Sequence, residues 1–448
     1  AASIARIKQD ALGALGRGVI EQVCAELGHA WRERELDPAT TVALFVQQVL
    51  HGNVPCSEVR HLVGKHFTPS AYCQARARLP LAVIQSLLTR VCDAAMAATR
   101  QTNLLWLGRH RVFHIDGSTF SMPDTPELRE AFGLPSGPKP GCGFPTAHLL
   151  VLFHAQSGLL LDAWASPLHT GDVSQVAEAH AHLSRGDVLI GDDTFSTYAH
   201  LAMLLRLGLH GLFPVHHRRL VDFTKGRPHT AGGGGKDRVA GMPTSRWIKS
   251  LGKEDQLVEY FKPSSVPAWM SQEEYDALPK SIIVRELRRT MRRPGLGSVT
   301  LTMVTTLVDE AIYPADDLLE LRLRRWDVET NLRHLKITMN MDVLHCKSEA
   351  GVRKELSVFC LVYNLVRAVL LEAARRQEVP VARLSFADAL KWTRHARPGD
   401  VLAELIVNPR RPDRAEPRCK KRRPKQYDLM NKPRDVLRKG LKNQRKNA

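Results

Sequence analysis

The sequence lacks the long apolar segments that would place a protein in a membrane. No run of about 18 or more uncharged apolar residues, the length that spans a bilayer, occurs in its 448 residues. The N-terminal residues AASIARIKQD also lack the charged-then-apolar layout of a signal peptide. We therefore expect a cytoplasmic protein that has no membrane partner.

Cysteine is sparse, and its spacing excludes the common zinc motifs. The eight cysteines form no Cys-x-x-Cys pair and show no matched Cys/His spacing, so reduced and mostly buried thiols are expected. They are Cys24, Cys56, Cys73, Cys92, Cys142, Cys346, Cys360 and Cys419.

Negative charge is also in short supply. The chain contains 64 Lys and Arg against 46 Asp and Glu, which gives a net charge of +18. Such an excess favours a polyanionic partner, and nucleic acid is the first candidate. Residues 410–448 hold 16 of the Lys and Arg and four of the acids. We interpret this tail, which includes RCKKRRPKQY, as a phosphate-binding arm; the alternative is a solvated end that contacts nothing specific.

The length of the chain predicts two or more domains, and the hydrophobic pattern changes along it accordingly. Helical periodicity dominates the first hundred residues, and strand-like and helical segments then follow in the order β-β-β-α-β-α-β. A Gly-rich loop with further strand-like segments comes next, and long helical segments come after it. We predict an α/β protein with a helical N-terminal DNA-binding domain (1–105), the first part of a catalytic core (106–217), a β-rich insertion (218–308), the helical end of the core (309–385) and a basic DNA-contacting tail (386–448).

Two aspartates follow apolar, strand-like segments. Asp116 ends a strand in HIDGST and Asp192 ends one in VLIGDD, so neighbouring strands would bring both carboxylates together. Hard oxygen ligands of this kind hold the pair of Mg²⁺ ions, roughly 3.5–4 Å apart, that phosphodiester chemistry needs. Taken alone, an Asp-Gly pair is more often a turn. Strand alternation is expected to point Asp193 to the other face.

A late helix carries the third acidic candidate. Arg322, Arg325, Glu329 and Lys336 are spaced by three, four and seven residues, which places them on one helix face. A metal-binding carboxylate would then be flanked by phosphate-binding cations. Without the two aspartates, an ordinary salt-bridged helix would be preferred, because an i,i+4 pair is worth only a few tenths of a kcal/mol.

Together these motifs resemble the DDE transposases of bacterial insertion sequences, in particular the insertion-sequence-4 family, over most of the chain. The matching segments are FHIDGST, GDDTFSTYAHL, RRWDVE and DVLHCKSEAGVRKEL. The family's helix signature is Tyr, two residues, Arg, three residues, Glu, six residues, Lys. This chain matches it at Arg325, Glu329 and Lys336 and has Arg322 in place of Tyr, where Arg could still grip a phosphate.

The resemblance implies an RNase H-like catalytic core with a β-rich insertion, and a cut-and-paste reaction on double-stranded DNA. Water would attack at the element ends, and the freed 3′-OH would then attack target DNA. The implied catalytic and metal-binding residues are Asp116, Asp192 and Glu329, with two Mg²⁺ or Mn²⁺ ions, and the DNA-binding residues are Arg322, Arg325 and Lys336.

Several neighbouring residues allow further expectations. Trp326 is expected to be a buried anchor that orients Glu329. Related enzymes hold a flipped base against an aromatic ring, and Trp247 or Trp269 could do this, although core packing is the commoner use. The remaining polar residues beside Asp116 do not have the spacing of a Ser-His-Asp triad; they are His114, Ser118 and Thr119.

Two other interpretations stay open. A metal-dependent nuclease with the same core would share the two-metal chemistry but lack strand transfer. An inactive or domesticated transposase would act only as a DNA-binding protein, and Arg322 keeps this possible. Pairing two transposon ends calls for two copies, so we expect a homodimer in the DNA complex. The helix KELSVFCLVYNLVRAVLLEAARRQ has an apolar face for it, although packing on its own core is the commoner use.

Overall fold

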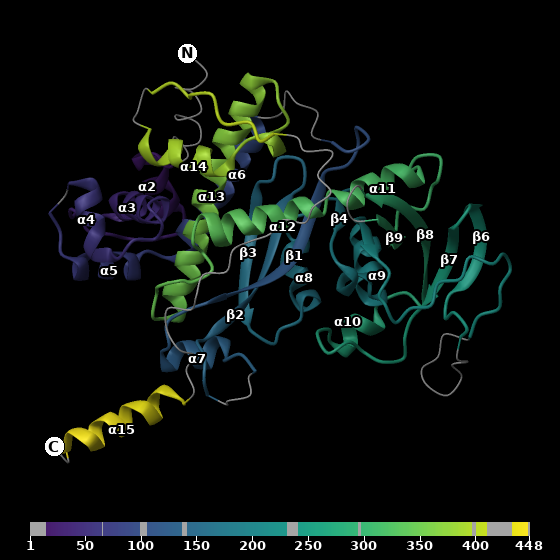
Figure 1. The fold of residues 1–448 in the computed structure, drawn as a ribbon, viewed down its shortest axis with the longest axis horizontal. Helices are drawn as coiled ribbons and strands as arrows, with labels where there is room; N and C mark the ends of the chain where they lie inside the picture. Colours follow the sequence, from purple (N-terminus) through teal and green to yellow (C-terminus); the bar gives the residue numbers. More distant parts are fainter. Residues whose placement is uncertain are drawn as a thin grey trace.

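The computed structural model describes most of the chain and shows a mixed α/β protein built on one large sheet (Figure 1). The described residues are 15–64, 66–98, 105–136, 141–230, 241–293, 297–396, 400–409 and 432–446. The segment RCKKRRPKQY and Cys419 lie outside them, so the predicted phosphate-binding arm stays a prediction.

The N-terminal part is helical, as its apolar periodicity predicts. Its helices are α2 (Arg17–Glu26), α3 (Pro38–Leu50), α4 (Cys56–Val63), α5 (Pro69–Arg78) and α6 (Leu81–Ala98). Polar side chains cap the start of α3 and of α5. The Asp37 side chain accepts a hydrogen bond from the Thr40 amide at 2.7 Å, and Thr68 caps α5 in the same way. Each cap is followed by a proline at the first helical position, which fixes where the helix begins.

Nine strands form the sheet in the order β3-β2-β1-β4-β5-β9-β8-β7-β6. They are β1 (Val112–Ser121), β2 (Thr146–His154), β3 (Leu160–Pro167), β4 (Val188–Ile190), β5 (His210–Pro214), β6 (Arg246–Gly252), β7 (Asp255–Phe261), β8 (Ser281–Arg293) and β9 (Gly297–Thr305). The first three form the expected antiparallel meander, and β4 and β5 run parallel to β1.

The region predicted as a β-rich insertion contains four strands, and these continue the main sheet. Strand β9 pairs antiparallel with β5, with Leu212 opposite Thr305. The sheet therefore runs without interruption from β3 to β6. Strands β6 to β9 all lie within residues 218–308, and through β9 the chain returns to the sheet edge that β5 leaves open.

Helices and helical turns connect and cover the strands, except the last helix, α15 (Arg434–Lys446), which projects away from the sheet (Figure 1). They are α7 (Pro126–Phe132), η2 (Asp172–Gln175), α8 (Val176–His180), η3 (Asp193–Ser196), α9 (Tyr198–Leu207), α10 (Gln272–Asp276), α11 (Ala315–Leu323), α12 (Trp326–Arg333), η4 (His334–Thr338), α13 (Glu349–Gln377), η5 (Val381–Arg383), α14 (Phe386–His395) and α15 (Arg434–Lys446). The short helix α7 was not expected; Thr125 caps it.

The late helix expected to carry Arg322, Arg325, Glu329 and Lys336 on one face is wrong in one respect, because it is divided into three helical segments. Helix α11 ends at Leu323 and α12 begins at Trp326. Between them the amides of Arg325 and Asp327 donate to carbonyls three residues back, which is the tighter 3₁₀ pattern. A π-helical turn, η4, then follows α12 directly. These local departures change the direction in which the side chains of the signature helix point.

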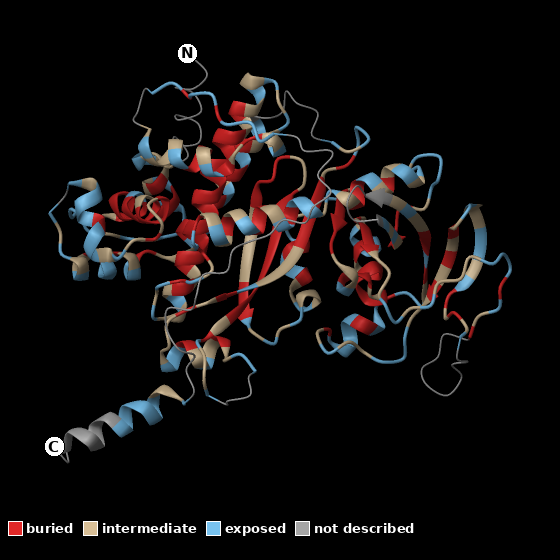
Figure 2. Ribbon diagram, viewed as in Figure 1, coloured by how far each residue is buried: buried red, intermediate tan, exposed pale blue. Residues whose placement is uncertain are grey.

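Helix α13 lies at the centre of the main core (Figure 2). The Asn364 side chain holds it to the edge of the sheet, because its oxygen accepts from the Leu160 amide at 2.8 Å and its nitrogen donates to the Leu160 carbonyl at 2.7 Å. The apolar face considered for dimerisation therefore packs on the chain's own core.

Helix α13 also has the length and composition of a membrane-spanning helix. Among the described helices, α13 is by itself long and apolar enough to cross a bilayer, and α5 with α6 pass only when taken together across a 78° bend. In α13, however, 94% of the most apolar window is buried inside the protein. Buried core helices commonly have this composition.

Candidate active site

Asp116 lies in the middle of β1, so its predicted place at the end of a strand is wrong. Strand β1 pairs with β2 as far as Ser121, with Asp116 opposite Val151. Its pairing with β4, however, ends at His114 opposite Ile190. Asp116 therefore stands just beyond the point where β4 stops, which is the edge that Asp192 also occupies.

Asp192 comes two residues after the end of β4 and caps the helical turn η3. One of its carboxylate oxygens accepts from the Thr194 amide at 3.0 Å and from the Thr194 hydroxyl at 2.5 Å. Glycine is required just before it, because a Cβ on Gly191 would lie 2.5 Å from the Phe195 ring. The tight turn thus brings the carboxylate next to β1.

Asp193 has a different environment, but the predicted reason is wrong. Strand β4 ends at Ile190, so strand alternation does not reach Asp193. It begins η3 instead, and its carboxylate lies 3.5 Å from the His217 ring.

Arg325 joins the first and third predicted carboxylates. Its Nη1 atom lies 3.3 Å from Asp116 Oδ2, and its Nη2 atom lies 2.8 Å from Glu329 Oε1. The Asp116 and Arg325 side chains are 14% and 17% exposed, whereas Glu329 is 57% exposed. Residues 209 positions apart in the sequence are therefore in direct contact, and Glu329 is the member that faces solvent.

Arg322 is buried beside the same carboxylates. Burial lowers the pKa of its guanidinium to about 10, Arg325 lowers it further, and Asp192, Asp116 and Glu329 act in the opposite direction. In the described part of the chain, its Nε atom has no hydrogen-bond partner. The residue that replaces the family's Tyr thus faces the acidic cluster.

His114 lies next to Arg322, and its ring is hydrogen-bonded to no nucleophile among the described residues. It shares a face of β1 with Asp116 and Ser118, because alternate residues of a strand point the same way. Burial, followed by the charges of Arg322 and Arg325, lowers its pKa to about 3. Neither ring nitrogen has a hydrogen-bond partner among the described residues.

Lys336 contacts Ser118, the third residue on this face of β1 after His114 and Asp116. Its ammonium group donates to the Ser118 hydroxyl at 2.9 Å, and burial lowers its pKa. The π-helical turn η4 holds it there. Ser118 therefore binds a signature cation, which agrees with the rejection of a Ser-His-Asp triad.

The ionised form of Asp116 is disfavoured in this site. Burial raises its pKa to about 6, and the nearby charges of Asp192 and Asp172 also raise it. Arg325 and the Gly117 amide act in the opposite direction. Burial is therefore the main reason that the proton is held more tightly, and the neighbouring carboxylates add to it.

Asp172 is a neighbour of the site that the sequence did not reveal. Its carboxylate accepts a hydrogen bond from the His148 ring. A Cβ on Gly117 would lie 2.2 Å from Asp172 Oδ1, so the carboxylate fills the space of the missing side chain. The available signal was Gly117 itself, because a glycine inside a strand often marks a site where another group approaches closely.

The expectation for Trp326 is wrong, because its side chain is 48% exposed. In α12 the buried residues are Val328, Asn331 and Leu332. Trp269 packs against the core cluster under the insertion, which favours the core-packing alternative, and Trp247 is half-buried in β6.

Comparison with known proteins agrees with the geometry. The family described as "Transposase DDE domain" matches residues 107–365, more than half of the chain. The chain belongs to the DDE transposase family. All three predicted carboxylates of this transposase lie inside the matched span.

The relatives of the transposase agree with the insertion-sequence-4 type. The transposase InsG for insertion sequence element IS4 of Escherichia coli strain K12 is 25% identical over 382 residues, covering 80% of this chain and 78% of the relative. InsZ from the same strain is 29% identical over 149 residues, covering 33% of this chain and 49% of the relative. A solved piggyBac transposase synaptic complex with hairpin DNA aligns with 87% of this chain and 79% of its own, at 8% identity and a TM-score of 0.43.

Proposed function

We propose that this transposase cuts the ends of its element and joins them to target DNA, with Asp116, Asp192 and Glu329 as its catalytic carboxylates. The observation that carries the proposal is the placement of these acids around one sheet edge and one arginine. Asp116 and Asp192 share one sheet edge, and Arg325 contacts both Asp116 and Glu329. Membership of the family supports DNA cleavage and strand transfer in general.

The proposed reaction consists of two substitutions at phosphorus. First, water forms a new P–O bond at an element end, the bond to the 3′ oxygen breaks, and that oxygen leaves and takes up a proton. The resulting 3′-OH then attacks a phosphodiester of the target, whose own 3′ oxygen leaves. Both steps need an activated oxygen nucleophile and a stabilised leaving oxygen, so one site serves both.

The residues present fit two Mg²⁺ or Mn²⁺ ions. Their donors are three carboxylates, which are the hard ligands that such ions prefer. Burial, and then the nearby charges of Asp192 and Asp172, raise the pKa of Asp116, and a bound cation would favour its ionised form. When bound, such ions activate the nucleophile and stabilise the leaving oxygen. Asp116, Asp192 and Glu329 would hold them.

The surrounding cations are proposed DNA ligands. Arg325 and Lys336 line the carboxylates on one side, and Arg322 is buried against them. Guanidinium and ammonium groups bind phosphate oxygens, and Arg can do so through two parallel hydrogen bonds. Arg322 could therefore hold the scissile phosphate where the family has Tyr.

The fold supports an RNase H-like core as part of the same proposal. Strands β3, β2 and β1 form an antiparallel meander, β4 and β5 continue it in parallel, and a later helix, α12, carries Glu329. The helical N-terminal domain and the basic tail would hold the DNA ends, and two copies would pair them. Such an enzyme would work in the cytoplasm, on double-stranded DNA, without a membrane partner.

A joining assay on pre-cut ends tests the proposal against its alternatives. The full chain is mixed with Mg²⁺, supercoiled target and DNA that carries the element's ends with a free 3′-OH. Covalent joining supports the transposase. Cleavage of uncut ends without joining would indicate a nuclease, and binding with neither reaction would indicate a DNA-binding protein only.

A further inference from the structure

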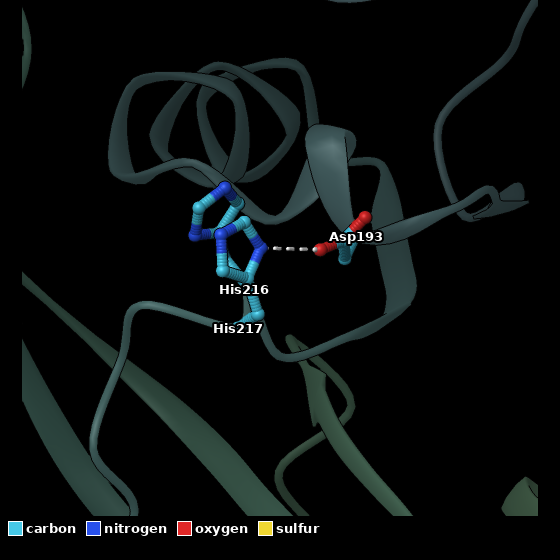
Figure 3. Close-up of side chains that lie close together, drawn as sticks. All are labelled: Asp193, His216 and His217. Atoms are coloured by element: carbon cyan, nitrogen blue, oxygen red, sulfur yellow. Dashed lines mark ion pairs between the residues drawn. The ribbon is translucent and has the colours of Figure 1, made fainter.

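A second group of side chains that could bind a metal ion begins at Asp193, the residue after Asp192. Figure 3 shows its three members. The group comprises Asp193, His216 and His217, and one ligand atom from each lies within 4.8 Å of the others. In the described part of the chain no other trio of His, Cys, Asp or Glu meets this distance, and the three catalytic carboxylates do not.

The Ser196 side chain links the segment that carries Asp193 to the segment that carries the two histidines. Asp193 begins the η3 turn, and the two histidines follow strand β5. The Ser196 hydroxyl donates to the Asp193 carbonyl at 2.7 Å and accepts from the His216 amide at 3.2 Å. One side chain thus fixes the spacing of the two segments before any ion binds.

The side chains have room to act as ligands. Among the ion pairs of the described residues, the partner of the Asp193 carboxylate is His217, at 3.5 Å from its Nδ1 atom. The nearby guanidinium of Arg219 lies 3.8 Å from the centre of the Tyr260 ring. The His217 side chain is 70% exposed, so an ion here would be open to solvent on one side.

The donor set and its spacing indicate a transition metal. Imidazole suits Zn²⁺, Cu²⁺ and Ni²⁺, whereas Mg²⁺ prefers carboxylates and water. Two ligands each about 2.0–2.1 Å from a tetrahedral ion lie about 3.3 Å apart. The 3.5 Å between Asp193 and His217 is close to this value. The centre of the His216 ring lies 4.2 Å from that of His217, and the His216 Nδ1 atom accepts from the Arg218 amide at 3.2 Å, so its Nε2 atom would be the ligand.

We propose that Asp193, His216 and His217 bind one transition-metal ion of the Zn²⁺ class, separate from the ions of the three catalytic carboxylates. Three protein ligands leave at least one coordination position open to solvent. Since Asp193 directly follows Asp192, the ion would tie the turn that Asp192 caps to the segment after β5. The site does not depend on whether the enzyme is active.

Cobalt provides the test, because its visible absorption reports imidazole ligation. The metal-stripped full chain is titrated with Co²⁺ in a large excess of Mg²⁺, which occupies oxygen-ligand sites. We expect one Co²⁺ per chain, displaced by Zn²⁺. His217→Ala, His216→Ala and Asp193→Asn should each weaken binding by about tenfold or more, the range seen even for outer-shell partners of metal sites.

Two controls complete the design. His66→Ala removes an exposed histidine elsewhere and should bind Co²⁺ as the unmodified chain does. The double variant Asp116→Asn, Glu329→Gln should also retain the site, which separates this inference from the proposed function. Circular dichroism of each variant verifies folding. Absence of stoichiometric binding, binding indifferent to the three substitutions, or binding lost in the double variant would overturn the proposal.

Discussion

The guanidinium of Arg325 lies 3.3 Å from the carboxylate of Asp116 in the centre of the site. The same group also binds Glu329, so one cation stabilises two of the three acids. Arg325 therefore sets the charge balance against which divalent ions and DNA must bind.

Replacing Arg325 is expected to shift the pH dependence of cleavage. Its charge lowers the pKa of Asp116, so Arg325→Gln should raise that pKa above its present value of about 6. Protons then compete with metal ions at a higher pH, and the acid limb of the profile should move up by roughly one unit. Arg325→Lys, which keeps the charge, should move it less. If the acid limb of the pH profile did not move in Arg325→Gln, the proposed effect of the Arg325 charge on Asp116 would be contradicted.

Asp116 should reduce stability at neutral pH in the absence of divalent ions. Its pKa rises from 3.8 to about 6 on folding, so the folded chain binds more protons between these values and stability falls as pH rises through this window. At about 1.4 kcal/mol per pKa unit, Asp116→Asn should raise the free energy of unfolding at pH 7 by about 1–3 kcal/mol.

The matched control is Glu320→Gln, whose carboxylate is 71% exposed. Denaturant unfolding at pH 7 and at pH 4 gives the comparison. The gain in Asp116→Asn should vanish at pH 4, where Asp116 is protonated in the folded state. An equal gain at both pH values would point to packing and not to charge.

Gly117 should tolerate no side chain while Asp172 remains. A Cβ there would lie 2.2 Å from Asp172 Oδ1, so Gly117→Ala should cost about 1–3 kcal/mol of stability through overpacking. Adding Asp172→Ala should restore part of this loss, and a double-mutant cycle on the free energy of unfolding measures the coupling. Gly18→Ala, with nothing within 4 Å of the new Cβ, is the control. Additive effects at 117 and 172 would argue against the contact.

Lys336 should contribute one phosphate contact. Lys336→Ala should weaken DNA binding across sequences and reduce the slope of affinity against salt concentration by about one. The comparison is Lys280→Ala, an exposed lysine before β8. Fluorescence anisotropy over a range of salt concentrations reports the slope. The same slope in both variants would remove Lys336 from the DNA interface.

The sequence was sufficient for much of the fold because apolar periodicity and polar caps are local signals. The strands of the meander, the later strands and the helix caps at Asp37 and Thr68 are each determined by short segments of sequence. The place of Asp116 within β1 did not, since it depends on how far two partner strands extend.

The candidate site was predictable where spacing alone decides which residues meet. Arg325 and Glu329 are four positions apart on a helix, and the family signature adds Lys336. The contact of Asp172 with Gly117 and the exposure of Trp326 depend on tertiary packing and on a break in the helix, which periodicity does not show.

We propose that Asp116, Asp192 and Glu329 are the carboxylates required for both DNA cleavage and strand transfer. The most direct measurement compares nicking and strand transfer on DNA that carries the element's ends, with Mg²⁺ and with chelator, for the native chain and for Asp116→Asn, Asp192→Asn, Glu329→Gln and Glu320→Gln. We expect the first three substitutions to abolish both reactions while DNA binding survives, chelator to do the same, and Glu320→Gln to stay active. Cleavage that persists in any of the three carboxylate variants would contradict this proposal.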